Sequence, residues 1–406
     1  LKAKVFAITG SNGKTSTKEF LATILAESFK VHYSKGSFNN HWGVPFSILA
    51  ASKSDEVLIL EMGMNHAGEI SKLVEIAIPD VVLCTMVGRA HIGNFGGKQA
   101  EIAKAKEEIY LSSPNAISIF NLDDAYTRKM FVHFKKRNMR SSKKILTFSK
   151  SKSQKICDVQ LHVSSASFKG LIIEGQIGKT KKKVLVPVIG EHNVVNLMAA
   201  SAMALAAKMP VSKIWKGLSK CQSEWGRNQL VQLDGGTQIL FDAYNANPDS
   251  MSAMIQNIKK IQKAPKKMGR DKMSSDKMGR VFLVLGEMLE LGDQTKKSHQ
   301  ELGEQVGALN CSAVWFMGES QKEFEKGFYA AQKPSGKKSA RQLWAKSGIN
   351  KINNNLIISS GYEESLAIRM RSMLNPQDVV IMKGSRGMKL EKVLLCWHPN
   401  FKTKNN

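Results

Sequence analysis

The sequence is poor in cysteine and proline and contains no long apolar run. Its 406 residues include five widely spaced cysteines without a CxxC pair, so neither a disulfide framework nor a zinc site is indicated. Ten prolines and a 42% hydrophobic fraction argue against a disordered or low-complexity chain. No apolar stretch reaches the roughly 18 residues that a membrane span needs. We therefore expect a soluble, cytoplasmic globular protein of two or three domains.

Acidic residues are also scarce. The sequence has 34 of them and 60 lysines and arginines, which gives a net charge of +26. Such an excess of positive charge is typical of proteins that bind nucleic acid. The positive charge is concentrated in residues 128–155, 179–183 and 263–280, which do not show the pattern of interleaved aromatics that is typical of a base-stacking surface. We therefore favour solvated loops and expect no specific nucleic-acid partner, although a basic nucleotide-binding module that contacts a polyanion stays an alternative. The repeated K-M-G-R within 263–280 indicates a low-complexity insertion.

The remaining sequence alternates short apolar segments with helical patterns. Residues 4–9, 56–61, 80–86 and 116–120 read as buried strands, and a helix is expected from Ser16, which together predict a parallel sheet covered on both faces. Shorter alternating segments between 156 and 189 predict a small antiparallel sheet attached to this domain, and a helix is expected over 193–208.

A second α/β series begins near Gly226, with apolar segments that end in DAY, GEM, GE, SS and KGS. We therefore predict an α/β protein with two domains. Residues 1–225 form a central P-loop parallel-sheet domain with the small antiparallel sheet, and residues 226–406 form a Rossmann-like domain. A cleft between them, at the carboxyl ends of the strands, is the expected catalytic site.

The strongest motif is TGSNGKTST at the end of the first predicted strand. A glycine-rich turn that opens a helix lets backbone N–H groups surround phosphate oxygens, and a following lysine and threonine suit the outer phosphates and Mg²⁺. We expect ATP there. The predicted nucleotide contacts are Gly10, Ser11, Asn12, Gly13, Lys14, Thr15 and Ser16.

This short G-x-x-G-K-T form resembles the ATP loop of the Mur ligases and of their relatives, the folylpolyglutamate synthetases. Further matches follow in family order. In LEMGMNHAGEI, Glu61 at the end of a strand takes the place of the family's Mg²⁺ carboxylate, and Thr15 is the other predicted ligand of this ion. In FNNHWGVP the resemblance brings Asn40, from the pair Asn39 and Asn40, near the nucleotide.

The resemblance also implies a second Mg²⁺ site. His91, in GRAHIGNFGG, takes the place of a metal-site residue, and AKAKEEIY resembles the segment with the family's carbamoylated lysine, here Lys106. A carbamate oxygen suits a hard cation. A solvated helix face is the alternative reading of that lysine, and a structural loop residue that of His91.

GEHNVVN contains Asn193 and Asn196, which on the spacing alone either present both amides to one edge of the nucleotide or include a helix cap. In the Mur ligases this segment contacts the base.

The second half carries the remaining matches. The resemblance implies that Arg227 reaches the γ-phosphate when the domains close, and that Asp242 meets the ATP ribose or the hinge. The predicted substrate contacts are Tyr244, Asn245 and Asn247 in one segment and Lys383, Ser385 and Arg386 in another. A glycine-flanked arginine there suits a substrate carboxylate.

DAYNANPDSM, GEMLELG and MKGSRGMKLE together resemble the family member that adds D-alanyl-D-alanine to UDP-N-acetylmuramoyl-tripeptide. The implied reaction is ATP-dependent amide-bond formation through an acyl phosphate, with Lys14, Lys106, His91 and Arg227 as catalytic residues. A ligase that extends folate or another carboxylate with glutamate is the alternative. We expect a monomer.

The chain starts at Leu1 and reaches a strand almost at once, so no signal peptide is indicated. In that family member, a domain that holds the UDP sugar precedes the ATP loop, whereas only nine residues precede Gly10 here. We expect either a fragment or a protein whose substrate binding has been altered or delegated.

Overall fold

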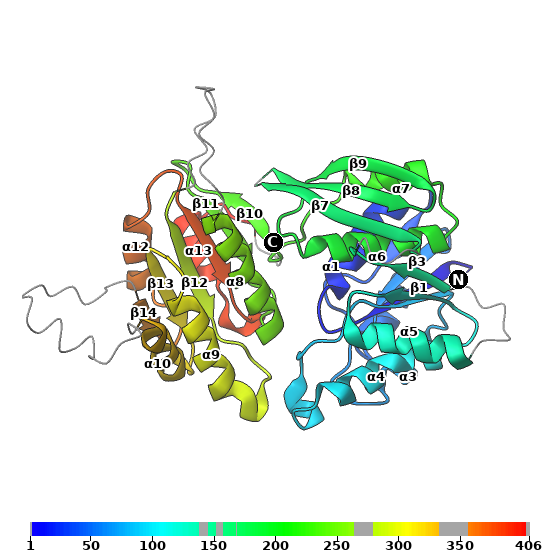
Figure 1. Cartoon of the computed structure of the whole chain (residues 1–406), viewed down its shortest axis with the longest axis horizontal. Coiled ribbons are helices and arrows are strands. Elements are labelled where there is room, and N and C mark those ends of the chain that lie inside the picture. Colours follow the sequence, from blue (N-terminus) through cyan, green and yellow to red (C-terminus); the bar gives the residue numbers. More distant parts are fainter. Residues whose placement is uncertain are drawn as a thin grey trace, which may run out of the picture. The chain divides into compact units, whose positions relative to one another are not determined.

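The computed structural model describes residues 2–137, 145–151, 157–167, 169–263, 279–332 and 356–402. The chain divides into two compact units, Leu1–Glu224 and Trp225–Asn406, each with its own sheet (Figure 1). The K-M-G-R repeat of the predicted insertion lies largely outside the described residues, as does part of the basic stretch 128–155.

The first unit contains a nine-stranded sheet in the order β2-β3-β1-β4-β5-β6-β7-β8-β9. Its strands are β1 (Lys4–Thr9), β2 (Val31–Tyr33), β3 (Val57–Glu61), β4 (Val81–Cys84), β5 (Ile117–Asn121), β6 (Ile145–Phe148), β7 (Val159–Ser167), β8 (Gly170–Ile177) and β9 (Thr180–Val186). The strands up to β6 pair in parallel, as predicted. The predicted antiparallel strands β7 to β9 are also present, but they extend the same sheet, because Val159 pairs with Phe148.

Helices cover both faces of this sheet. One layer contains α1 (Lys14–Leu25), α6 (Asn193–Ala206) and α7 (Val211–Leu218), and the other contains α2 (Gly43–Leu49), α3 (Glu69–Ile76), α4 (Gln99–Leu111) and α5 (Ala125–Arg137). Side chains of β1 alternate between the layers, since Phe6 and Ile8 join the first core and Ala7 joins the second. The alanine-rich helix α6 is almost entirely buried, which is typical of a helix that is apolar all round.

The second unit has a six-stranded sheet in the order β10-β11-β15-β12-β13-β14. Its strands are β10 (Gln229–Gln232), β11 (Gln238–Asp242), β12 (Val281–Gly286), β13 (Ala313–Met317), β14 (Leu356–Ser359) and β15 (Val379–Lys383). All pairs are parallel except β10 with β11. This Rossmann-like arrangement confirms the predicted α/β class.

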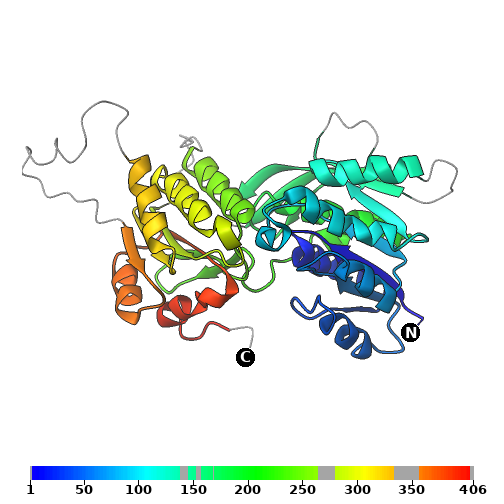
Figure 2. The ribbon, with the colours of Figure 1, turned by 90° about the horizontal axis from the view of Figure 1, so that it is seen from below.

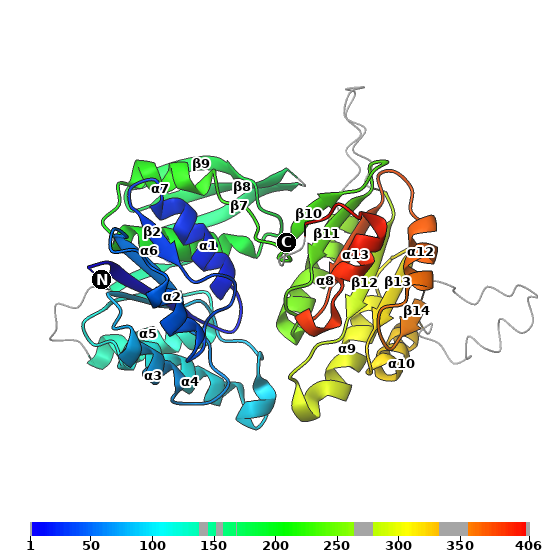
Figure 3. The ribbon, with the colours of Figure 1, turned by 180° about the vertical axis from the view of Figure 1, so that it is seen from behind.

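Two helix layers enclose this second sheet. Helices α8 (Pro248–Lys263), α9 (Thr295–Gly307) and α10 (Gln321–Ala331) form one layer, and α12 (Glu364–Ser372) and α13 (Glu391–Trp397) form the other (Figure 2). Figure 3, from behind, brings α13 to the front of the second unit. Within the described ranges, every helix is too short or too polar to cross a bilayer.

Strand order determines where a ligand can meet each sheet. In the first unit β1 lies between β3 and β4, and the chain leaves β1 and β4 towards opposite edges of the sheet. Open α/β sheets bind ligands at such a switch point, beyond the carboxyl ends of the strands. The TGSNGKTST segment begins at this point.

Candidate active site

The turn between β1 and α1 admits only glycine at two positions. Gly10 has φ +141°, and a Cβ there would lie 1.9 Å from Oγ1 of Thr85. Gly13 has φ +84°, and a Cβ there would lie 2.3 Å from Oδ1 of Asn196. Thr85 follows β4, and its hydroxyl donates to the carbonyl of Asn12 at 2.6 Å. Thr85 therefore fixes the loop at the switch point, and the sequence alone did not indicate this residue.

The start of α1 is suited to an anion. The N-cap residue is Gly13, which has no side chain that could occupy the first amide groups. Lys14 begins the helix, two residues before the predicted start, and its ammonium donates to the carbonyl of Gly10 at 2.8 Å. Ser11 is anchored through its amide to the carbonyl of Met86 at 2.9 Å. Ser16, another predicted contact, is half-buried on α1.

A carboxylate lies beside this loop. Glu61, at the end of β3, is 1% exposed, and its Oε2 accepts a hydrogen bond from Oγ1 of Thr15 at 2.8 Å. Its Oε1 accepts from Nδ2 of Asn39 at 2.8 Å. The structure thus brings Thr15 and Glu61 together. Asn40, the asparagine that the sequence analysis selected, instead accepts from the amides of Trp42 and Gly43 at the start of α2.

Thr15 and Glu61 fit a magnesium site. Both offer oxygen donors, and Mg²⁺ is usually held by one or two protein oxygens together with substrate phosphates. Across the part of the chain that the structure describes, no three His, Cys, Asp or Glu side chains converge as a ligand cluster. Phosphate oxygens would therefore complete the coordination.

Lys106 is 2% exposed on α4. Burial, reinforced by the positive charge of Lys14, lowers the pKa of Lys106 to about 7. Lys104, the other lysine of the segment, is exposed and pairs with Glu101 at 2.9 Å. The half-buried His91 precedes the short 3-10 helix η1 (Ile92–Phe95), between β4 and α4, in a left-handed conformation with φ 61°.

The two asparagines at the start of α6 are hydrogen-bonded within the protein. Asn193 donates through Nδ2 to the carbonyl of Ile189 at 2.8 Å, and Asn196 donates to Oδ1 of Asn193 at 3.0 Å. The side chain of Asn193 therefore does not cap the helix, whose N-cap residue is His192. Asn196 also lies against Gly13, so these two hydrogen-bonded amides support the glycine-rich loop between β1 and α1.

The predicted residues of the second unit form two groups around β11 and β15. Arg227 stacks its guanidinium on the ring of Tyr244, 4.4 Å from the centroid. Asp242 accepts from Nζ of Lys383 at 2.5 Å, and that ammonium also donates to the carbonyl of Asn245 at 3.3 Å.

Asn247 begins α8 as a capping residue, since its Oδ1 accepts from the amide of Ser250 at 3.0 Å. Ser385 is buried, and its hydroxyl accepts from the amide of Leu289 at 3.0 Å. Arg386 is hydrogen-bonded to Glu391 and stacks on Trp225. The charged groups of the predicted substrate loop are therefore already paired inside the second unit.

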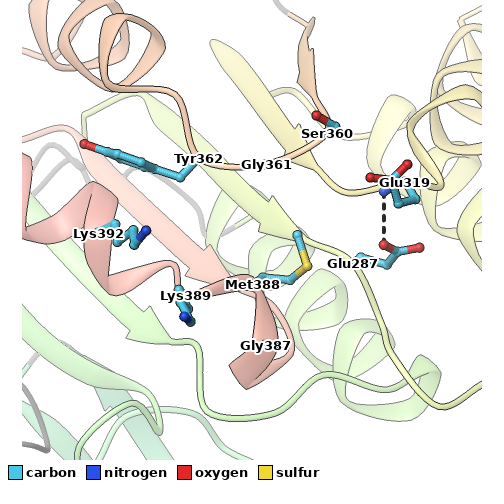
Figure 4. A pocket seen from close by; sticks show the side chains of 9 residues that line it. All are labelled: Glu287, Glu319, Ser360, Gly361, Tyr362, Gly387, Met388, Lys389 and Lys392. Atoms are coloured by element: carbon cyan, nitrogen blue, oxygen red, sulfur yellow. Dashed lines mark hydrogen bonds between the residues drawn. The ribbon is translucent and has the colours of Figure 1, made fainter.

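A cavity of about 360 Å³ lies at the carboxyl edge of this second sheet, beyond the strands β12 to β15 (Figure 4). It was not predicted from the sequence, because its walls come from four separate segments. Glu287 and Glu319 line one side, and Tyr362, Lys389 and Lys392 line another. Glu287 is held by the amide of Glu319 at 3.0 Å and by the hydroxyl of Ser320.

The chain matches two family models, that of the Mur ligase middle domain over residues 8–204 and that of the Mur ligase glutamate ligase domain over residues 226–386. It is 30% identical over 397 residues to UDP-N-acetylmuramoyl-tripeptide--D-alanyl-D-alanine ligase of Bacillus subtilis, covering 97% of this chain and 76% of that relative.

Solved structures agree with this result. MurF of Acinetobacter baumannii superposes with a TM-score of 0.77 at 28% identity, covering 97% of this chain and 76% of that one. MurF ligase of Thermotoga maritima, solved in complex with ADP, gives 0.74 at 28% identity and covers 98% and 80%. With both domains matched in order and the phosphate loop at the switch point, the chain belongs to the Mur ligase family of ATP-dependent ligases.

Proposed function

We propose that this protein joins D-alanyl-D-alanine to UDP-N-acetylmuramoyl-tripeptide at the expense of ATP, in the cytoplasmic synthesis of peptidoglycan precursors. The observation that carries the proposal is the contact between Thr15 and Glu61 beside a glycine-rich loop at the start of α1. The names of the relatives supply the substrates. The two domains would be residues 1–225, which bind ATP, and residues 226–406.

The chemistry starts from a carboxylate, whose oxygen is a poor leaving group. The terminal carboxylate of the tripeptide attacks the γ-phosphorus of ATP, which gives an acyl phosphate and ADP. The amine of the dipeptide then attacks the acyl carbon, loses a proton, and expels phosphate as the amide forms. Lys14 and Arg227 neutralise the charge that develops on the transferred phosphoryl group. Positioning supplies most of the rate.

Thr15 and Glu61 would hold one Mg²⁺, which neutralises phosphate charge when it is bound. A second would use His91 and carbamoylated Lys106. Carbamate formation requires a neutral amine that attacks CO₂ and loses a proton. A lysine whose pKa lies at about 7 is neutral in a large fraction of molecules at physiological pH, which supports this modification.

Gly10 to Ser16 would surround the phosphates, and Asn40, Asn193, Asn196, Arg227 and Asp242 would complete the nucleotide site. Asn196 contacts the loop at Gly13, and Asn193 supports it by accepting a hydrogen bond from Asn196.

The cavity of the second unit is our candidate site for the incoming dipeptide. D-alanyl-D-alanine is a zwitterion, with an ammonium at one end and a carboxylate at the other. Glu287 and Glu319 suit the ammonium, and the exposed Lys389 and Lys392 suit the carboxylate. The predicted substrate contacts of this unit stay part of the proposal: Tyr244, Asn245, Asn247, Lys383, Ser385 and Arg386.

Coupled ADP release tests the proposal. The protein, supplied with ATP, Mg²⁺, UDP-N-acetylmuramoyl-tripeptide and D-alanyl-D-alanine, should release ADP. Omission of either the tripeptide substrate or the dipeptide should stop this release. A version extended at its N-terminus is assayed in parallel. If neither protein forms ADP with this pair, the assignment fails.

The second candidate is a ligase that extends folate or another carboxylate with glutamate, in the manner of the folylpolyglutamate synthetases. The same assay with folate and glutamate discriminates between the two. We also expect a monomer, which light scattering measures.

A further inference from the structure

The strongest unassigned feature is a buried lysine on the phosphate helix. Lys18 lies one turn beyond Lys14 on α1, and none of its surface is exposed. A buried ammonium costs several kcal/mol unless its donors are satisfied. The mechanism above does not use Lys18, so its burial requires a separate explanation.

Two hydrogen bonds and one ion pair surround the ammonium of Lys18. Its Nζ lies 2.5 Å from the carbonyl of Ser34, 2.7 Å from the carbonyl of Gly36 and 3.2 Å from Oε1 of Glu19. An ammonium has three N–H groups, and two of them donate to these carbonyls while the charge is balanced by Glu19. Two of the acceptors are backbone carbonyls of a single segment, the one that follows β2.

That segment leads directly to the candidate metal carboxylate. At its start, the amide of Ser34 donates to the carbonyl of Ile59 on β3 at 3.1 Å. At its other end, the carbonyl of Asn39 accepts from the amide of Gly63 at 2.7 Å. Between these anchors Gly36 adopts a left-handed conformation with φ 55°. Lys18 therefore fixes the middle of the loop from which Asn39 reaches Glu61.

The hydrogen bonds form a closed ring. Thr15 and Lys18 leave α1 one turn apart, Thr15 donates to Glu61, and Asn39 donates to the other oxygen of the same carboxylate. Lys18 returns to the segment that carries Asn39. The carboxylate can turn only if one of these contacts breaks.

We propose that Lys18 is a positioning residue for the metal site. By holding the carbonyls of Ser34 and Gly36, it keeps Asn39 on Oε1 of Glu61 and leaves Oε2 directed at Thr15 and the cation. This inference rests on the proposed function, because it assumes that a cation binds at Thr15 and Glu61. A purely structural lysine would affect stability without affecting Mg²⁺ affinity selectively.

The test measures Mg²⁺ affinity apart from turnover. ADP binding is titrated calorimetrically at a series of Mg²⁺ concentrations for the wild type, Lys18→Met, Asn39→Ala and the double variant. Lys72→Met, which changes an exposed lysine on α3, is the matched control. Both single variants should weaken the apparent Mg²⁺ affinity about tenfold or more, as loss of an outer-shell contact does, and should leave Mg²⁺-free ADP binding unchanged.

The double variant discriminates further. If Lys18 acts through Asn39, the Mg²⁺ affinity of the double variant should equal that of the single variant with the lower affinity. Additive losses would overturn the proposal, as would an unchanged Mg²⁺ affinity in Asn39→Ala, even if Lys18→Met failed to fold. A wild type that binds ADP without any Mg²⁺ dependence would overturn the proposed function itself.

Discussion

Two loops of this protein have similar compositions and different electrostatics. Both follow a parallel strand and contain glycine, serine and basic residues, one after β1 and the other after β15. After β1, neutral donors hold the carboxylate Glu61, and Lys14 donates to a backbone carbonyl. After β15, Lys383 pairs with Asp242 and Arg386 pairs with Glu391. The second loop therefore neutralises its charges within the fold, whereas the hydrogen bonds that Thr15 and Asn39 donate to Glu61 come from uncharged groups.

The largest expected difference between these regions concerns turnover. Lys14→Ala should lower kcat about a thousandfold, because it removes a charge that stabilises the transition state, with little change in thermal unfolding. Lys392→Ala, beside the second loop, should raise KM for the dipeptide about tenfold and leave kcat unchanged. Steady-state ADP release measures both. Equal effects on kcat would show that the two regions do not differ as argued.

Lys106 provides a second test, through pH. Lys106→Met should lower turnover about a hundredfold. With ¹³C-bicarbonate, the wild type should give a carbamate resonance that is absent from the variant. Because the ammonium form predominates below pH 7, the wild-type carbamate signal should increase as pH rises through about 7.

The same residue couples stability to pH. In the unfolded chain Lys106 has its ordinary pKa of 10.5, and in the fold its pKa is about 7. Between these values the unfolded chain binds more protons, so the free energy of unfolding should rise with pH in that window. Urea unfolding of the unmodified protein at several pH values, compared with Lys106→Met, measures this rise. An identical pH dependence in the variant would contradict the buried, weakly basic lysine.

Asp242→Asn tests the neutralised loop. This change leaves the ammonium of Lys383, which is 2% exposed, without its charged partner. Breaking such a pair should destabilise the second unit by about 3 kcal/mol, measured by urea unfolding. Replacing the exposed Lys104–Glu101 pair on α4 with two acidic side chains, by Lys104→Glu, should cost less than about 1 kcal/mol, because both groups are solvated.

The smallest effect contrasts two glycines. Gly13→Ala should destabilise the first unit by about 1–2 kcal/mol and weaken ADP binding, because φ is positive and the added methyl group meets Asn196. Gly361→Ala, in the cavity of the second unit, places its methyl group in open space and should change stability by less than about 0.5 kcal/mol. Thermal unfolding and ADP titration compare the two. A neutral Gly13→Ala would remove the steric argument for the loop.

Much of the fold was predictable, because buried parallel strands read as continuous apolar segments. Each of the nine named strand segments, from 4–9 to the one that ends in KGS, contains or forms a strand. The separate antiparallel sheet was the exception. Sequence alternation indicates strands with two different faces but not the partner of the first strand, and a single pairing of Val159 with Phe148 merges the sheets.

The site was predictable only where function is local in sequence. Gly10 to Thr15 form one turn and one helix start, so a motif of nine consecutive residues is enough to predict their chemistry. Asn39 and Asn40 are adjacent and chemically identical, and only the approach of the loop to β3 decides that Asn39 contacts Glu61. Likewise, no sequence pattern joins Glu287 to Lys392, because Glu287 follows β12 and Lys392 lies on α13, far along the chain.

By itself, the sequence determined the parallel α/β architecture and the glycine-rich loop after β1, because hydrophobic periodicity and a glycine-rich turn act over a few neighbouring residues. The tertiary structure decided the protonation and pairing of the charged residues. Lys106 and Lys18 each lie in a helix, and the sequence around them does not distinguish a buried lysine from a solvated one. Burial lowers the pKa of Lys106. The ammonium of Lys18 is held by the neighbouring Glu19 and by two carbonyls of the segment after β2, which only the fold brings to α1.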